Sequence, residues 1–263
     1  MYKKFLDLGK QPLANKFLTK AEISKKEDFY NLSIGFNKKN NLVSILKTIS
    51  SKRMFNDKYP YRSSMSETMK NYFYELSKKI IKEFNPSCFL EIGSNDGTLI
   101  KNFDKKKSIC VEPCKNHAKI TTKMGYKTYP KYWNLSLAKK IKKENKKIDL
   151  IYSANTISHI YDLTSVFKSA EYVLSKNGIL IIEDPSLLEC LKLGSYDQFY
   201  NEHIHVFSLL SISKLVRKQN MEVYNIETLN TAGGSIRYYI KRKVNKNIRI
   251  KKSVLLLLKK EKK

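Results

Sequence analysis

Short apolar runs alternate with segments of helical spacing through the middle of this chain, and few folds accommodate that alternation. The runs are CFLEIG, SICVEP, KTY, DLIYSANT and GILIIEDP, and the segments between them lie at 97–104 and in NHAKITTKM, LSLAKKIKKE and DLTSVFKSAEYVL. Strands that are apolar along their whole length are covered on both faces, as in a parallel sheet with helical crossovers. The sequence therefore predicts an α/β fold with a Rossmann-like, doubly wound sheet.

The flanking segments predict further elements. Residues 1–55 consist of short strand candidates, NLSIGF and NLVSIL, and turn formers such as LDLGKQPLAN. An amphipathic helix follows at SETMKNYFYELSKKIIKEF, with Ser66 as its N-cap. After the parallel strands come a helix at SLLSISKLVRKQN, an antiparallel pair at MEVYNIETLN and GGSIRYYIKRK, and a helix that begins at KKSVLLLLKKEKK. We divide the chain into a small β-containing module at 1–55, a main domain at 56–245 and the start of a C-terminal region at 246–263.

The charge of the chain is strongly positive, but it does not by itself predict a nucleic-acid partner. The net charge is +27, and only six of the 51 basic residues are arginine. Because the lysines are spread along the whole chain, we do not expect nucleic acid to be the partner. None of the four cysteines forms a CxxC pair, and no apolar run is long enough to span a bilayer. With no signal peptide at the start, we expect a reduced, cytoplasmic protein that makes no contact with a membrane.

The segment LEIGSNDG forms the first predicted turn from strand to helix, where a doubly wound sheet brings its backbone closest to a ligand. Its glycines, Gly93 and Gly97, form neither the GxGxxG pattern nor a phosphate-binding GK[ST] loop. The spacing E-x-G-x-x-x-G resembles the first motif of class I S-adenosylmethionine-dependent methyltransferases. Glu112 closes the next strand about 20 residues after Gly93, where a carboxylate accepts hydrogen bonds from ribose hydroxyls. An ordinary tight turn with a surface glutamate remains the alternative.

Histidines supply the second group of candidate residues. His159 follows the strand DLIYSANT, and His203 lies in FYNEHIHVFS after the last parallel strand, so we expect both at the carboxyl edge of the sheet. An imidazole at that edge is placed to remove a proton from a substrate carbon or oxygen. We expect His205 to make structural hydrogen bonds and His117 to lie on a helix surface. A metal site at NEHIH lacks a third and fourth ligand, so we predict none.

Seven segments, taken in order, resemble the sugar C-methyltransferases that act on nucleotide-linked 4-keto-deoxyhexoses. They are LDLGKQPLAN, YPYRSSMSETM, FLEIGSNDGTL, VEPCKN, ANTISHIYDL, FYNEHIHVFSLLSISKL and GGSIRYYI. The resemblance implies a class I methyltransferase sheet, S-adenosylmethionine as the cofactor and a nucleotide-sugar as the substrate. It also implies that a base removes the proton next to the ketone and that the resulting carbanion takes the methyl group.

The resemblance also implies roles for individual residues. His203 matches the base. The other catalytic candidates are Tyr200, Glu202, His159, Tyr59 and Tyr61. The residues that match the cofactor side are Glu91, Gly93, Asn95, Asp96, Gly97, Glu112 and Asn155. Asn201 and Arg237 are expected on the substrate side, although a strand arginine that faces solvent is equally consistent with the position of Arg237.

The sequence departs from that family in three places. Asn37 and Asn40 stand where the family has a zinc-binding CxxC knuckle, so we predict no structural zinc. Asn201 replaces a histidine before the Glu-His pair. The family continues through a second nucleotide-fold domain, whereas we expect 246–263 to be only the truncated start of a C-terminal region.

Other functions remain open at this stage. The same fold also methylates sugar hydroxyls or RNA, and a truncated relic that binds the cofactor without catalysis is the alternative outside enzymes. The sequence indicates neither the sugar, the nucleotide and the carbon methylated nor the oligomeric state.

Overall fold

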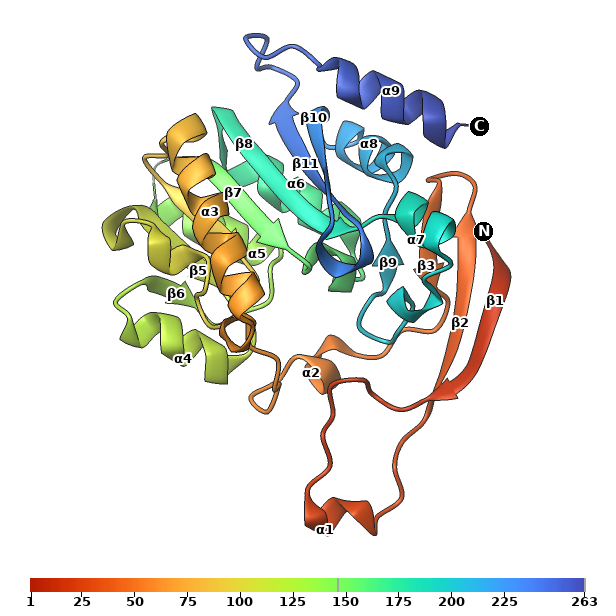
Figure 1. Cartoon of the computed structure of the whole chain (residues 1–263). Helices are drawn as coiled ribbons and strands as arrows, with labels where there is room; N and C mark the ends of the chain where they lie inside the picture. The colour runs from red at the N-terminus through yellow and green to blue at the C-terminus, as the bar shows by residue number, and fades with distance from the viewer. Residues whose placement is uncertain (146, 263) are drawn as a thin grey trace.

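A computed structural model describes residues 1–145 and 147–262, so Lys263 at the end of the C-terminal region lies outside the described residues. Its centre is a seven-stranded sheet in the order β10-β11-β8-β7-β4-β5-β6 (Figure 1). Strands β4 to β8 pair in parallel, and β11 and β10 add an antiparallel edge beyond β8. The bounds are β4 Phe89–Ile92, β5 Ser108–Val111, β6 Lys127–Tyr129, β7 Ile148–Ala154, β8 Leu174–Pro185, β10 Met221–Leu229 and β11 Ser235–Arg242. The predicted doubly wound α/β sheet is confirmed.

Helices cover both faces of this sheet, as the apolar strands require. On one face, α5, α6, α8 and α9 contribute side chains to a single core with β7, β8 and β11. On the other face, α3 packs Phe73, Leu76 and Ile80 against the sheet. The helices are α1 Lys20–Ile23, α2 Ser51–Met54, α3 Glu67–Phe84, α4 Lys115–Lys123, α5 Leu135–Glu144, α6 Leu163–Val173, α7 Leu187–Leu193, α8 Leu209–Arg217 and α9 Lys252–Glu261.

Ser66 caps α3 as predicted, because its side chain accepts a hydrogen bond from the Met69 backbone. The helix predicted at 97–104 does not form. A 3-10 turn forms there at Ile100–Asn102, and a second one follows the segment at Lys105–Lys107. The Asn102 side chain donates to the carbonyls of Thr98 and Leu99, and so takes acceptors that a continuing helix needs for its backbone.

The N-terminal module forms a second, four-stranded sheet in the order β1-β2-β3-β9. Its strands are β1 Tyr2–Gln11, β2 Tyr30–Asn37, β3 Leu42–Ile45 and β9 His205–Val206. The stretch LDLGKQ, read as turns from its composition, belongs to β1, which takes up Gly9 through a register shift between Asp7 and Lys10. The last strand comes from the main domain and pairs antiparallel with β3. The module at 1–55 is therefore joined to the main domain through one sheet.

No helix within the described residues is both long and apolar enough to cross a membrane.

Candidate active site

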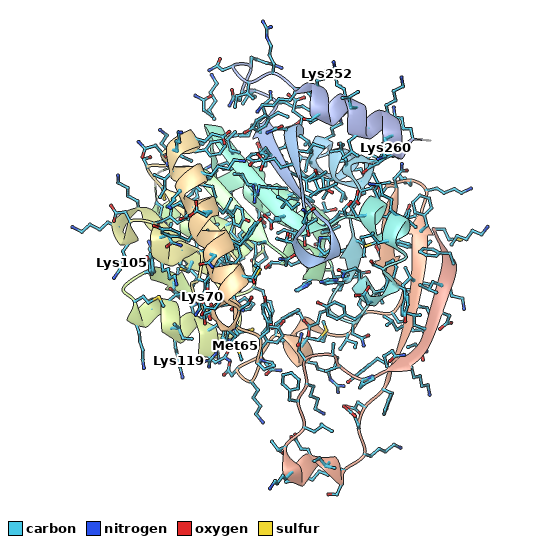
Figure 2. The ribbon with its side chains drawn as sticks, viewed as in Figure 1. Met65, Lys70, Lys105, Lys119, Lys252 and Lys260 are labelled. Atoms are coloured by element: carbon cyan, nitrogen blue, oxygen red, sulfur yellow. The ribbon has the colours of Figure 1, made fainter. Side chains whose placement is uncertain are left out.

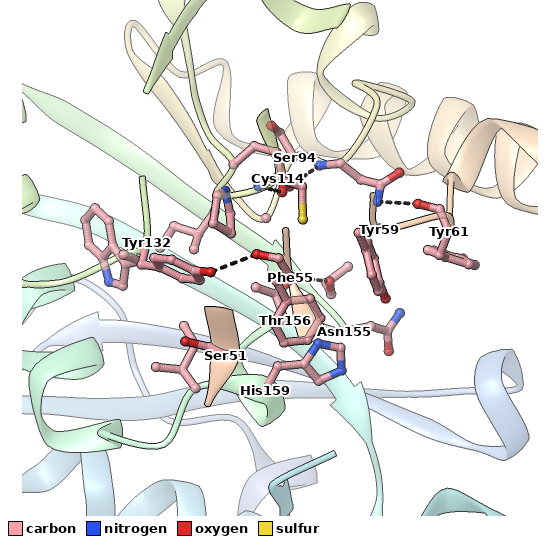
Figure 3. Close-up of a pocket in the computed structure, with 18 of the residues that line it drawn as sticks. Ser51, Phe55, Tyr59, Tyr61, Ser94, Cys114, Tyr132, Asn155, Thr156 and His159 are labelled. Atoms are coloured by element: carbon pink, nitrogen blue, oxygen red, sulfur yellow. Dashed lines mark hydrogen bonds between the residues drawn. The ribbon is translucent and has the colours of Figure 1, made fainter. Parts of the chain in front are cut away.

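A cavity of about 870 Å³ lies at the carboxyl edge of the parallel strands (Figure 3). The turns after β4, β5 and β7 form one wall, at 91–95, 112–114 and 154–156. The segment from Thr48 to Ser63 contributes the opposite wall, together with the loop that carries His203. The cavity therefore lies between the main sheet and residues that follow the N-terminal module.

Gly93 makes the first turn possible. Its φ is +72°, and a Cβ added there would lie 2.2 Å from Oγ1 of Thr156. Glycine is the residue that adopts this φ without steric cost and permits so close an approach. Gly97, with φ +83°, does not line the cavity; it packs the turn against Thr121 of α4.

Glu112 ties the first turn to the second strand. One carboxylate oxygen accepts from the Asn95 backbone at 2.8 Å and the other from the Cys114 backbone at 2.9 Å. Burial raises the pKa of this carboxyl above its usual value. Asn95 also accepts from the Ser63 backbone at 3.0 Å, which fixes the 61–64 segment above the turn.

Asp96 belongs to the same turn but does not line the cavity. It accepts hydrogen bonds from the Ser64 backbone at 3.2 Å and the Thr98 hydroxyl at 2.7 Å. The structure therefore gives Asp96 and Gly97 supporting positions, whereas Glu91, Gly93, Asn95, Glu112 and Asn155 all line the cavity.

On the wall formed by the turns after β4, β5 and β7, three buried polar atoms have no hydrogen-bond partner among the described residues. They are Oε2 of Glu91, Oγ of Ser94 and Oδ1 of Asn155. Burial, and then the charge of Glu112, raise the pKa of Glu91 well above its ordinary value. Unpaired buried polar groups are rare and commonly mark a missing ligand. The wall thus fits a ligand that carries several hydrogen-bonding groups.

The second group of side chains is aromatic. His159 stacks between Phe55 and His203, with ring centroids 5.2 Å apart on each side. Figure 3 shows Phe55 over His159. The His159 side chain is half-buried, and its buried Nε2 atom has no hydrogen-bond partner in the described part of the chain. Burial lowers the pKa of His159 well below its ordinary value, so the ring is neutral.

The hydrogen bonds of His203 define its tautomer. Nδ1 lies 2.9 Å from the Gln198 carbonyl, which only accepts, so Nδ1 carries the proton. Nε2 then has a free electron pair, and the Tyr200 hydroxyl lies 3.0 Å from it. Burial lowers the pKa of His203 to about 4. The ring is therefore a neutral base whose electron pair is held by a tyrosine on the same cavity wall.

Glu202 lies behind this wall and does not line the cavity. It accepts from Asn15 at 2.9 Å and from the hydroxyl of Tyr59 at 2.9 Å. Burial and the charge of Glu202 raise the pKa of Tyr59, which keeps the phenol protonated. Glu202 thus connects the N-terminal module to the loop that carries His203.

Other expected site residues lie elsewhere. Tyr61 lines the cavity, but Asn201 does not: it is buried and donates to the Pro12 carbonyl at 3.1 Å. Arg237 is only 4% exposed, and its guanidinium binds Glu183, Glu227 and Tyr72. The expectation of a substrate-facing or solvent-facing arginine is therefore wrong, because β11 is covered on both faces.

Two expectations about histidines have different outcomes. His117 is fully buried on α4, so the surface position predicted for it is wrong. His205 is hydrogen-bonded to Ser44 at 2.8 Å and lies near the Tyr161 carbonyl at 3.3 Å, as expected for a structural residue. With His203 turned to Gln198 and His205 turned to Ser44, the two rings do not share a metal site.

Possible metal donors do meet at another point in the described residues. One atom each from Glu112, Cys114 and His117 lies within 4.8 Å of the others. Both oxygens of Glu112 already accept backbone hydrogen bonds, and burial raises the pKa of the Cys114 thiol, which disfavours the thiolate that a metal needs. We assign this group to the turn that carries Glu112, and the absence of a metal cofactor stays a prediction.

Sequence reasoning missed several lining residues. Phe55, Asn15, Thr156 and Tyr132 all line the cavity. Asn15 lies in one of the seven quoted segments, and Trp133, also on the wall, is the single tryptophan of the chain. Those two signals were available, whereas the place of Phe55 depends on tertiary packing.

Comparison with known proteins gives two family matches. Residues 61–226 match the family model of a methyltransferase domain, and residues 2–55 match that of a putative zinc binding domain. Within 2–55 there is neither cysteine nor histidine. The residues present therefore do not fit a zinc site of the usual thiolate and imidazole type.

The chain is also similar to one curated relative and to two solved structures. C-methyltransferase NovU from Streptomyces niveus is 24% identical over 236 residues, which are 88% of this chain and 56% of that protein. A SAM-dependent methyltransferase from Leishmania major has a TM-score of 0.51 at 14% identity, covering 68% of this chain and 75% of that one. A putative methyltransferase in complex with the Haloferax volcanii Trm112 activator has a TM-score of 0.52 at 7% identity, covering 68% and 94%. Both structures share the fold.

Proposed function

Because the chain belongs to the methyltransferase domain family, whose methyl donor is S-adenosylmethionine, we propose that it methylates the carbon next to the ketone of a nucleotide-linked deoxy sugar. The observation that supports this most is His203, a neutral imidazole with its electron pair on the wall of the cavity that Gly93 and Glu112 also line. A carbon acceptor needs a base of this kind, because its proton must leave before the carbon becomes nucleophilic.

The cofactor fits the first three turns. The orphaned atoms of Glu91, Ser94 and Asn155 offer hydrogen-bond partners, and Glu112 keeps electron pairs free on its two oxygens. When bound, S-adenosylmethionine supplies a methyl group on a positively charged sulfur, which is an electrophile for a carbanion. The cavity wall carries carboxyl oxygens and no lysine or arginine among its described residues, and this suits that positive charge.

The acceptor side is formed by the aromatic group. His203 takes the proton next to the ketone onto Nε2, after the substrate displaces the Tyr200 hydroxyl from that position. Negative charge then develops on the ketone oxygen, and the unpaired Nε2 of the neighbouring His159 is the donor that we assign to it. Glu202 acts through Tyr59 and Asn15 as a positioning residue, because it does not line the cavity.

The match to NovU, which is named a C-methyltransferase, also supports a carbon acceptor. The chain spans 56% of that relative, so the nucleotide-sugar substrate rests on the seven sequence segments together with the base.

Exchange of the acidic proton tests the role of His203 directly. A 4-keto nucleotide-sugar in deuterium oxide should take up solvent deuterium in the presence of the wild-type protein. With His203→Gln, the rate of this exchange should be at least about 10²-fold lower. His205→Gln is the matched control, because His205 is also buried with its pKa lowered to about 4 but does not line the cavity. Equal exchange by wild type and His203→Gln would remove His203 as the base. Methylation of a hydroxyl without any carbon exchange would reassign the acceptor to oxygen.

A further inference from the structure

The charges on the cavity wall are the opposite of those on the chain as a whole. The chain carries 51 lysines and arginines, yet no lysine or arginine is among the residues that the structure places on the cavity wall. The ionisable acids there are Glu91, Glu112 and Asp162, and the pKa values of His159 and His203 are lowered by burial. The cavity therefore has no cation of its own to balance an anion.

Cations are plentiful immediately outside it. Nine of the lining residues have a lysine or arginine as a direct neighbour in sequence, and all of these neighbours except the half-buried Lys70 are exposed. We name the exposed set the basic rim, and it consists of Lys16, Lys47, Lys52, Lys58, Arg62, Lys115 and Lys131.

This separation of charge bears on the diphosphate of a nucleotide-sugar. An anion that leaves water needs a cation or several donors, and without them its burial is strongly unfavourable. The carboxyl groups on the same wall supply oxygen atoms and no compensating positive charge. S-adenosylmethionine meets no such obstacle, since its sulfonium and ammonium groups outnumber its one carboxylate.

We propose that only the uncharged sugar ring of the acceptor enters the cavity, and that its diphosphate stays outside, held by the basic rim. The proposal rests on the nucleotide-sugar acceptor proposed above, and it adds which part of that acceptor enters the cavity and which part stays outside. The sugar ring is then recognised by neutral groups that line the cavity, such as Asn15, Ser51 and Gln198. The rim attracts the anion and raises the rate of encounter more than it contributes to the methyl transfer itself.

Two acceptors that carry the same sugar, one with and one without the nucleoside diphosphate, separate the contribution of the cavity from that of the basic rim. The 4-keto-deoxyhexose linked to a nucleoside diphosphate is compared with the same sugar as its neutral methyl glycoside. The neutral acceptor should be methylated with a kcat within about threefold of the linked one, and its KM should not change with salt. The linked acceptor should have a lower KM that rises with salt concentration. A neutral acceptor that is not methylated while the linked one is would overturn the proposal.

Charge reversal on the rim gives the second comparison. Lys52→Glu with Lys58→Glu should lower kcat/KM for the linked acceptor about tenfold and leave the neutral acceptor unchanged. Lys252→Glu with Lys260→Glu on α9 is the control, because it makes the same change of net charge away from the cavity (Figure 2). Equal effects of the two double variants on the linked acceptor would remove the rim from its proposed role.

Binding without turnover separates this proposal from the proposed function. Trp133 is the single tryptophan and lines the cavity, so its fluorescence reports occupancy. A nucleoside diphosphate added with S-adenosylhomocysteine should leave that fluorescence unchanged at up to millimolar concentration. Saturable quenching by the nucleoside diphosphate would place an anion in the cavity and overturn the proposal, whether or not any sugar is methylated. Methylation of neither sugar, with fluorescence unchanged, contradicts the proposed function alone.

Discussion

Gly93 shows how one residue type decides whether the first turn forms. Its backbone lies in the left-handed region, and its amide donates to the Val111 carbonyl at 2.8 Å. Thr156 from the turn after β7 occupies the space where a side chain would be. The turns after β4, β5 and β7 therefore come together at this one position.

Gly93→Ala should weaken S-adenosylmethionine binding at least tenfold, because the new methyl group must push Thr156 and its turn out of the cavity wall. Gly194→Ala is the matched control, since Gly194 has φ +66° and open space around a Cβ. That control should lose about 1 kcal/mol of stability from backbone strain alone and keep its cofactor affinity. Calorimetric titration of both variants measures the difference. Equal affinities would show that the close approach to Thr156 is not needed for binding.

The low pKa of His203 makes a prediction about stability and pH. In the folded protein this pKa is about 4, and its ordinary value is 6.5, so the unfolded chain binds the extra proton first as pH falls. Its contribution is therefore fully present above about pH 6.5 and is lost as the pH falls from 6.5 to 4. Relative to His203→Gln, the wild type should lose up to about 3 kcal/mol across this range. Urea unfolding of both proteins at several pH values measures this, and parallel curves would contradict the burial of the ring.

Sequence patterns predict a cavity residue only when a local structural rule determines its position. Gly93 and Glu112 follow from the strand-turn-helix pattern, and their positions on the cavity wall could be expected from it. Phe55 could not, because its contact with His159 joins segments about 100 residues apart in the chain. Arg237 misled the prediction for a physical reason, because a charged residue in a strand is normally exposed unless buried partners pair with it.

The buried partners of Arg237 come from three elements, so this residue also shows how helices and strands are connected. Nε binds Glu183 on β8 at 3.1 Å, Nη1 binds Glu227 on β10 at 2.6 Å, and Nη2 binds Tyr72 on α3 at 2.6 Å. The Tyr72 hydroxyl itself donates to Glu183 at 2.6 Å. The antiparallel edge of the sheet is thereby fixed to α3 through one fully paired guanidinium.

Arg237→Met should cost about 3 to 5 kcal/mol of stability, because it leaves the buried Glu183 carboxylate without its cation. Arg217→Met, which removes an exposed arginine on α8, should change stability by no more than about 0.5 kcal/mol. Chemical denaturation gives both values. The KM for the acceptor, measured at a temperature where the Arg237→Met variant is folded, should be unchanged. A raised KM with normal stability would instead return Arg237 to the substrate side.

The elements that the sequence did not predict are short or depend on distant partners. Strand β9 has two residues and exists because β3 offers it a partner, so no periodicity marks it. The turns at 97–107 show the reverse case, in which an apolar spacing typical of a helix is interrupted by a side-chain hydrogen bond from Asn102. Long helices such as α3 and α5 were predicted closely because their apolar faces repeat over several turns.

At the scale of the whole molecule, the segment 202–206 connects the N-terminal module to the main domain in two ways. Strand β9 continues the N-terminal sheet directly after the loop that carries His203. Glu202, in that loop, holds Asn15 and Tyr59. The module therefore supports the wall that carries the base, which gives a physical reason for its presence even without a metal.

Lysines on α8 support the turn between β2 and β3, where the zinc-binding pattern would require thiolates. Lys214 donates to Asn41 at 2.8 Å and to the Lys39 carbonyl at 3.2 Å, and Lys218 donates to Asn40 at 3.1 Å. Asn37 accepts from the Lys39 backbone at 3.0 Å within the turn. Asparagine oxygens and lysine ammonium groups thus make the connections that a metal ion would otherwise make.

Removal of metal ions should therefore leave the fold intact. The melting temperature of the purified protein should change by no more than about 1 °C after exhaustive treatment with a chelator, because residues 2–55 contain no cysteine or histidine to bind a structural zinc ion. Zinc measured by mass spectrometry should be well below one equivalent. Zinc that is present and lost in a Cys114→Ser variant would place a metal at Glu112, Cys114 and His117, beside the proposed cofactor site. Zinc retained in that variant, with a melting temperature that falls on chelation, would contradict a module held together by hydrogen bonds.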